Sequence, residues 1–156
     1  MPEKTPQEIL EERIEAAKAR RLQTKASEAF ARAEQEATDL EAIADLECEL
    51  GFERVIAIEV GAWRPGMNCP VRVAVRVPLG SEKLCQVFIE KINRAKEGSK
   101  EKLTAQDALA IECWEYPKKG SEGYKAALEL APLILANAAL QIVLASQGRA
   151  EQEGKK

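Results

Sequence analysis

The sequence predicts a mostly helical α+β fold, with a long N-terminal helix, a two-stranded β-hairpin and a three-helix C-terminal unit. Three observations lead to this prediction. Residues 7–50 contain no glycine or proline, so nothing in them interrupts a helix. Residues 71–77 alternate valine with arginine or alanine, which is the period of a strand. Most of the remaining chain shows apolar residues at helical spacing between glycine and proline breaks.

The first helix has a clear start and a clear stop. Thr5 can cap it, Pro6 suits the first helical position, and Glu8 stands where a capping box places its acid. Gly51 supplies the stop. The sequence therefore predicts a helix of about 45 residues, roughly 65 Å long at 1.5 Å per residue.

The charge divides the chain into two parts. Residues 1–50 hold 7 Lys/Arg and 13 Asp/Glu, a net charge of −6, whereas residues 51–156 hold 16 and 13, a net charge of +3. Opposite signs indicate either two functional parts or one part that folds back on the other. We expect a long acidic helical arm over 1–50, a compact α+β domain over 51–148 and a disordered tail over 149–156.

The apolar stripe of the first helix is thin until its last turns, where Leu40, Ile43, Leu46 and Leu50 strengthen it. Two interpretations follow. The helix is solvated and docked only at its C-terminal end, or it pairs with a partner helix as a coiled coil.

The hairpin is expected from strands at 54–60 and 71–77, joined by a loop with prolines and glycines. The second strand should bury one face and leave the other wet. The expected buried face carries Val71, Val73, Val75 and Val77, and the wet face Arg72, Ala74 and Arg76. A two-stranded ribbon is marginal alone, so it must pack on helices or gain strands from another copy.

Three helices should follow. The first spans roughly 82–96. The second is short, begins at a capping motif at Thr104 and stops at Pro117. The third spans about 122–147, and Pro132 inside it makes the helix kink or begin afresh. Trp114 and Tyr116 are expected in core and helix-end packing.

Few features of the sequence support an enzymatic activity. The chain has no histidine, which removes the commonest general base and His-dependent nucleophiles. It has no C-x-x-C pair and no glycine-rich phosphate loop. The candidate carboxylates are interpreted as solvated: Glu59, Asp107, Glu112 and Glu115. We expect no enzyme activity, catalytic residue, metal site or cofactor.

The cysteines are interpreted as free thiols in a reducing cytoplasm. Cys48, Cys85 and Cys113 lie in partly apolar helical contexts, and Cys69, in a Pro-Gly-Met-Asn-Cys-Pro loop, is expected to be the most exposed. We find neither an N-terminal apolar segment, which would indicate secretion, nor an apolar run of about 18 residues, which would indicate a membrane span. The prediction is a cytoplasmic protein without membrane contact.

Nucleic-acid binding is also disfavoured. The formal net charge is −3 and the isoelectric point about 5.3, so no global basic field attracts phosphate. Arg72 and Arg76, with Arg54 and Arg64 near, could meet phosphate. They could equally pair across the strands with Glu59 and protect the sheet edge.

Trp63, beside Arg64 in the hairpin loop, is either a partner contact or a lid on the core. The segment Leu133–Leu144 is apolar almost all round, so it should be buried centrally or in an interface.

Four segments of the C-terminal half together resemble a known arrangement. They are Val71-Arg-Val-Ala-Val-Arg-Val-Pro78, the helix with Phe88, Ala110-Ile-Glu-Cys-Trp-Glu-Tyr-Pro117, and Tyr124-Lys-Ala-Ala-Leu-Glu-Leu-Ala-Pro132 with the Ala/Leu helix after it. This arrangement is similar to that of the small tail assembly chaperones of long-tailed bacteriophages and related prophage elements. The long acidic helix and the first strand with its Trp63 loop depart from that pattern.

The resemblance implies a non-enzymatic chaperone in the host cytoplasm. It would coat a long helical tape-measure protein, keep it soluble and recruit tail subunits. The implied contacts are a loop with Trp63 and Arg64, and an apolar helix with Leu133, Leu135, Leu140, Ile142 and Leu144. The same leucines could instead build the core. The alternative function is a structural subunit that self-associates into a homo-oligomeric ring or tube.

Overall fold

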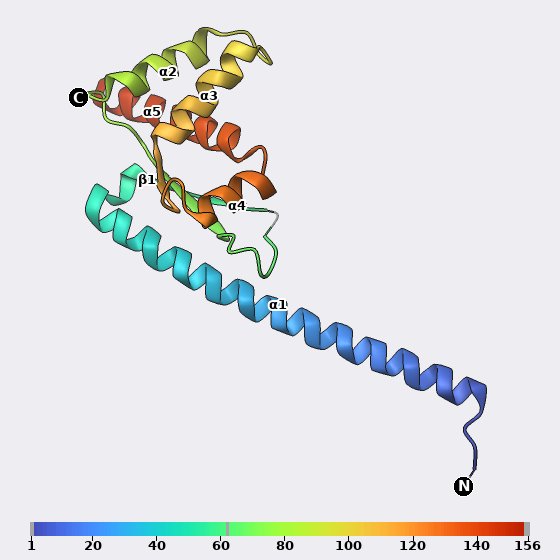
Figure 1. Cartoon of the computed structure of the whole chain (residues 1–156). Coiled ribbons are helices and arrows are strands. Elements are labelled where there is room, and N and C mark those ends of the chain that lie inside the picture. The colour runs from blue at the N-terminus through green and yellow to red at the C-terminus, as the bar shows by residue number, and fades with distance from the viewer. Residues whose placement is uncertain (1, 62, 155–156) are drawn as a thin grey trace.

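A computed structural model describes the backbone of residues 2–61 and 63–154. A small sheet lies between the C-terminal half of one long helix and a group of shorter helices (Figure 1). The elements, in chain order, are α1 (Pro6–Leu50), the 3₁₀ turn η1 (Phe52–Arg54), β1 (Val55–Glu59), β2 (Arg72–Arg76), α2 (Lys83–Arg94), α3 (Lys100–Glu112), β3 (Trp114–Tyr116), α4 (Glu122–Leu130) and α5 (Ile134–Gly154). The mostly helical α+β class and the long first helix are confirmed.

The predicted ends of α1 are also confirmed. The Thr5 hydroxyl accepts the Glu8 N–H at 3.2 Å, and the Glu8 carboxylate accepts the Thr5 N–H at 3.0 Å. This reciprocal pair is a capping box. At the other end Gly51 has φ +102° and donates its N–H to the Glu47 carbonyl. Glycine suits this position because it lacks the Cβ that makes positive φ costly.

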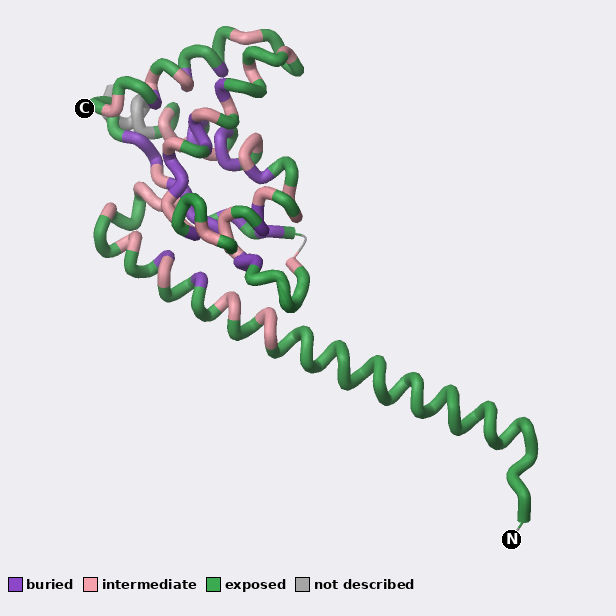
Figure 2. The backbone as a smooth tube through the Cα atoms, in the orientation of Figure 1, coloured by how far each residue is buried: buried purple, intermediate pink, exposed green. Residues whose placement is uncertain are grey.

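Only the second half of α1 touches the rest of the molecule. Residues 2–30 are exposed, whereas Asp39 and Ile43 are buried (Figure 2). The docked half packs against all three strands. The docking of α1 at its C-terminal end is confirmed, whereas pairing of the arm with a partner helix stays a prediction. The expected boundary between arm and domain at residue 50 is not confirmed, because the domain includes α1 from about residue 31 onward.

The predicted hairpin is present, but a third strand joins it. β1 and β2 pair antiparallel with Val55 opposite Arg76 and Glu59 opposite Arg72. β3 pairs with the other edge of β2, so the sheet order is β1-β2-β3 and the two-stranded prediction was wrong. The prediction that the second face of β2 is exposed to solvent was wrong as well. Ala74 on that face is completely buried, because α1 packs on the strands.

Four helices follow the hairpin instead of three. The chain breaks at Ala131–Leu133, and α4 and α5 are bent by 95°. The break lies at Pro132, which lacks the N–H that a continuous helix requires. α3 begins four residues before the expected cap at Thr104, since the Ser99 hydroxyl accepts the Lys102 N–H at 3.2 Å. Thr104 lies inside the helix and donates to the Lys100 carbonyl.

The last helix also extends further than expected. α5 continues through Gly148 to Gly154, so the predicted disordered tail is helical as far as the structure describes it. Residues 155–156 lie outside the described part of the chain. No single helix within the described residues is long and apolar enough to cross a membrane, and α4 with α5 up to Gly148 reaches that composition only as a bent pair.

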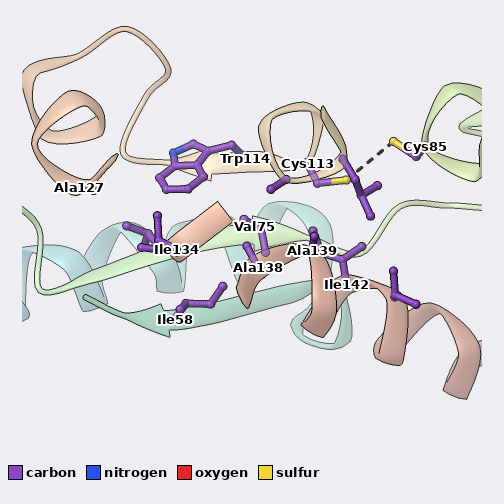
Figure 3. Close-up of a cluster of buried hydrophobic side chains, with 14 of the residues drawn as sticks. Ile58, Val75, Cys85, Cys113, Trp114, Ala127, Ile134, Ala138, Ala139 and Ile142 are labelled. Atoms are coloured by element: carbon purple, nitrogen blue, oxygen red, sulfur yellow. Dashed lines mark hydrogen bonds between the residues drawn. The ribbon is translucent and has the colours of Figure 1, made fainter. Parts of the chain in front are cut away.

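The core lies between the sheet and α5. Figure 3 shows Ala138, Ala139 and Ile142 of α5 close to Val75 of β2. Trp114 is buried, as expected, and its indole N–H donates to the Pro117 carbonyl at 2.7 Å. The side of α5 that carries Ala138, Ala139 and Ile142 is therefore covered by the sheet, whereas the side that carries Leu140 and Leu144 stays exposed.

Candidate partner-binding surfaces

An open groove runs between α5 and the pair α2 and α3, with a volume of about 570 Å³. We call it the α5 groove. Its lining is Ile92, Asn93, Glu97, Lys102, Gln106, Leu133, Ala136, Asn137, Leu140, Val143, Leu144 and Gln147. Half of these side chains are apolar, and the others are four amides and the ion pair of Lys102 with Glu97.

The structure divides the predicted contact residues of the last helix into two groups. Leu133, Leu140 and Leu144 line the α5 groove and are 77%, 55% and 58% exposed. Ile142 is completely buried in the core, and Leu135 is half-buried against it. Ile142 is therefore not available to a partner, because it lies on the side of α5 that packs against the sheet.

The accessible apolar residues of the α5 groove have helical spacing. Leu133, which precedes α5, is followed by Ala136, Leu140 and Leu144 at three, four and four residues, while Val143 is buried in the core. This is the spacing of positions that pack against a second helix. In the described structure α3 packs against α5 next to this face, yet Leu140 and Leu144 remain exposed. The groove thus leaves apolar side chains at one side of α5 exposed.

Trp63, one of the two residues of the predicted loop contact, partly covers the core. The half-buried Trp63 ring packs against the core, and its indole N–H donates to the Cys69 carbonyl at 3.0 Å. Of the two interpretations of Trp63, the structure favours the lid. Arg64 beside it is exposed, so of the pair it is the more accessible residue.

The arginines of the sheet are engaged within the chain. Arg72 binds Glu36 of α1 at 3.0 Å, and Arg76 binds Glu82 at 2.7 Å and Glu115 at 3.1 Å. Burial alone would lower the pKa of Arg76, but its hydrogen bonds with Glu82 outweigh that effect and raise it. These arginines are thus neutralised by carboxylates of the same chain, and phosphate would have to displace them.

The carboxylates considered as catalytic candidates are not brought together. Glu115 belongs to the Arg76 cluster, and Glu59 binds Arg32 of α1 at 2.9 Å. Glu59 stands opposite Arg72 in the hairpin, as the cross-strand interpretation expected, but each of the two takes its ion-pair partner from α1. The pairs Glu59–Arg32 and Arg72–Glu36 therefore fasten α1 to the sheet, whereas Glu115 joins β3 to β2 through Arg76.

Asp39 is the functional group that the sequence did not reveal. It is completely buried in α1. One carboxylate oxygen accepts the N–H groups of Val71 and Arg72 at 2.6 and 3.0 Å, and the other accepts the Tyr116 hydroxyl at 2.5 Å. Burial and the hydrogen bond to Asp39 raise the pKa of Tyr116. One side chain thus ties α1 to the start of β2 and to β3.

The thiols are distributed differently from the prediction. Cys48 on α1 is exposed, and Cys69, expected to be the most exposed, is buried. Cys85 and Cys113 are also buried, with their sulfur atoms 3.8 Å apart (Figure 3). Burial raises the pKa of all three buried thiols. A raised pKa keeps them protonated and unreactive at neutral pH.

Comparison with known proteins adds no relative to this picture. No family model, curated protein or solved structure matches the chain.

Proposed function

We propose that this protein is a non-enzymatic assembly chaperone, similar to those of phage tails, which binds a long helical client through the α5 groove. The observation that carries the proposal is the exposure of Leu133, Leu140 and Leu144 along one open apolar groove. Exposed apolar patches of this kind are typical of interaction sites. The resemblance of the C-terminal half to tail assembly chaperones supports the same function.

The form of the groove favours a helical client. A helix that presents apolar residues every three or four positions would pack them between the leucines of α5. The side-chain amides of Asn93, Gln106 and Asn137, which line the groove, can accept or donate hydrogen bonds along the polar side of such a helix. The resemblance implies a long helical tape-measure-type client, and covering its apolar surface would keep it soluble. The proposed site of action is the cytoplasm of the host cell.

The proposal is tested by affinity capture with three tagged forms of the full chain, expressed in the cells that normally produce it. The test variant is Leu140→Gln with Leu144→Gln, which makes the α5 groove polar. The control is Leu103→Gln on α3, since Leu103 is 51% exposed and does not line the groove. Captured proteins are identified and quantified by mass spectrometry.

The expected result is a long helix-rich protein, together with tail subunits, recovered by the natural chain and by the control. The double variant should recover at least about tenfold less, because a buried glutamine without partners costs more than 1.4 kcal/mol at such an interface. Equal recovery by the double variant would contradict the proposal. Recovery of only the chain itself, at a fixed copy number, would favour the structural oligomer instead.

A further inference from the structure

α1 carries a second apolar stripe, on the side opposite Asp39, and the structure leaves it exposed. Its members are Ala26, Phe30, Ala33, Ala37, Leu40 and Ala44. They are separated by four and three residues in turn, which is the a/d pattern of a coiled coil. Phe30 is 66% and Leu40 48% exposed. We call this stripe the α1 seam.

The charges of α1 are segregated along its length. Residues 13–25 hold five basic residues and one acid, a net charge of +4. Residues 28–49 hold eight acids and one arginine, a net charge of −7. Two parallel copies of such a helix in register would place like charges beside each other, whereas two antiparallel copies place opposite charges together.

We propose that two copies of this chain pair through the α1 seam as antiparallel helices, with the two-fold axis near residue 28. The sizes of the seam residues fit this arrangement. Phe30 of one copy then lies opposite Ala26 of the second copy, and Leu40 lies opposite Ala16 of the second copy. Alanine opposite each large residue lets the two helices approach closely and fill the space between them.

The charges fix the register. With the axis at residue 28, Glu34 flanks the seam two residues, about 3 Å along the helix, from the level of Arg20 of the second copy, and Glu41 is offset in the same way from Arg13 of the second copy. Two-fold symmetry repeats both pairs. A shift of one heptad in either direction keeps only one of the two. The register centred on residue 28 therefore satisfies more charges than its neighbours.

The geometry leaves room for this partner. Residues 6–30 of α1 are exposed, and the domain packs on the Asp39 side of the helix (Figure 2). The paired region would span about residues 12–44, roughly 50 Å of helix. A helix standing alone in water is marginal, so pairing also explains what keeps the arm helical. The α1 seam and the α5 groove lie on different helices, so this inference does not depend on the proposed function.

The first test is the mass of the full chain in solution, measured by analytical ultracentrifugation over a range of concentrations. The natural chain should form a dimer, twice the 17.2 kDa of one copy. Arg20→Glu should raise the dimer dissociation constant roughly tenfold, because it opposes Glu34 in two symmetry-related places. Adding Glu34→Arg should restore dimerisation, since each pair is then re-formed with its charges exchanged.

The matched control is Lys25→Glu, which makes the same charge change on the same exposed segment but off the α1 seam. It should change the dissociation constant less than about threefold. A natural chain that stays monomeric at 100 µM, roughly the upper end of useful weak association, would overturn the inference. So would a dimer that Arg20→Glu and Lys25→Glu weaken equally, or one that Glu34→Arg fails to rescue.

The second test is the direction of pairing. Spin labels are placed at Glu28→Cys or at Asp45→Cys, both in a Cys48→Ala chain so that no other exposed thiol is labelled. Antiparallel pairing puts the two labels at position 28 at the same level, on the outer sides of the pair, and therefore much closer together than those at position 45, which lie about 50 Å apart. Short distances at both positions would mean parallel pairing and would overturn the proposed arrangement.

Discussion

The buried carboxylate of Asp39 should control how firmly α1 is held to the domain. It accepts four hydrogen bonds, from Val71 N–H, Arg72 N–H, the Tyr116 hydroxyl and, at 2.9 Å, the Gln35 amide. Asp39→Ala removes all four and leaves two backbone donors beneath the helix without an acceptor. Each such donor costs about 1–3 kcal/mol. We expect the free energy of unfolding to fall by about 3–5 kcal/mol.

Asp39→Asn is the matched comparison. The amide keeps the shape and one acceptor oxygen for the two backbone N–H groups, while its NH₂ can donate to the Tyr116 oxygen. Its loss should stay near 1 kcal/mol. The assay is urea unfolding followed by tryptophan fluorescence, in which Asp39→Ala should lower the midpoint by about 2 M at a slope near 2 kcal/mol/M. The exposed Asp45→Ala is the control. If Asp39→Ala changes stability by less than about 0.5 kcal/mol, like a surface substitution, the anchoring role is refuted.

Three further predictions concern thiols, pH and the arginine cluster. In the folded chain Cys48 should react rapidly with a thiol reagent at pH 8, while the buried thiols react only in denaturant; two fast thiols would contradict the described burial. Stability should be unchanged between pH 7 and pH 9 and fall above pH 9, because the buried thiols keep a raised pKa while unfolded thiols ionise at their ordinary value of 9.0. The loss should exceed about 2 kcal/mol by pH 10.5 in urea titrations, and Cys48→Ala should leave that profile unchanged. Arg76→Lys should cost about 1–2 kcal/mol, because lysine cannot reproduce the forked contacts with Glu82 and Glu115; a neutral result in the same assay would show that the cluster is dispensable.

Much of the fold followed from local signals in the sequence. The capping box at Thr5, the glycine stop at Gly51 and the alternating valines of β2 each depend on residues a few positions apart. Such signals are readable because the physics behind them is local. Pro132 likewise predicted an interruption of the last helix, although the sequence left open whether the helix would bend or restart.

The missed features depend on contacts between distant segments. β3 has only three residues, too few to show a strand period, and Pro117 after it resembles a helix stop. Asp39 looks like any solvated helix acid until the fold brings Val71, 32 positions away, against it. Ile142 and Leu140 are two residues apart in one apolar helix, yet Ile142 is in the core and Leu140 is exposed. Which of them is buried depends on the side of α5 that faces the sheet.

The most direct test of the α5 groove as a client site is hydrogen exchange of the chain in complex with the client that it captures, compared with the free chain. Binding through the groove predicts slower exchange confined to residues 133–147 and to the facing residues 92–106, with the arm over residues 6–30 unchanged. Unchanged exchange in both groove segments, with protection elsewhere, would contradict the assignment of the α5 groove as the client site.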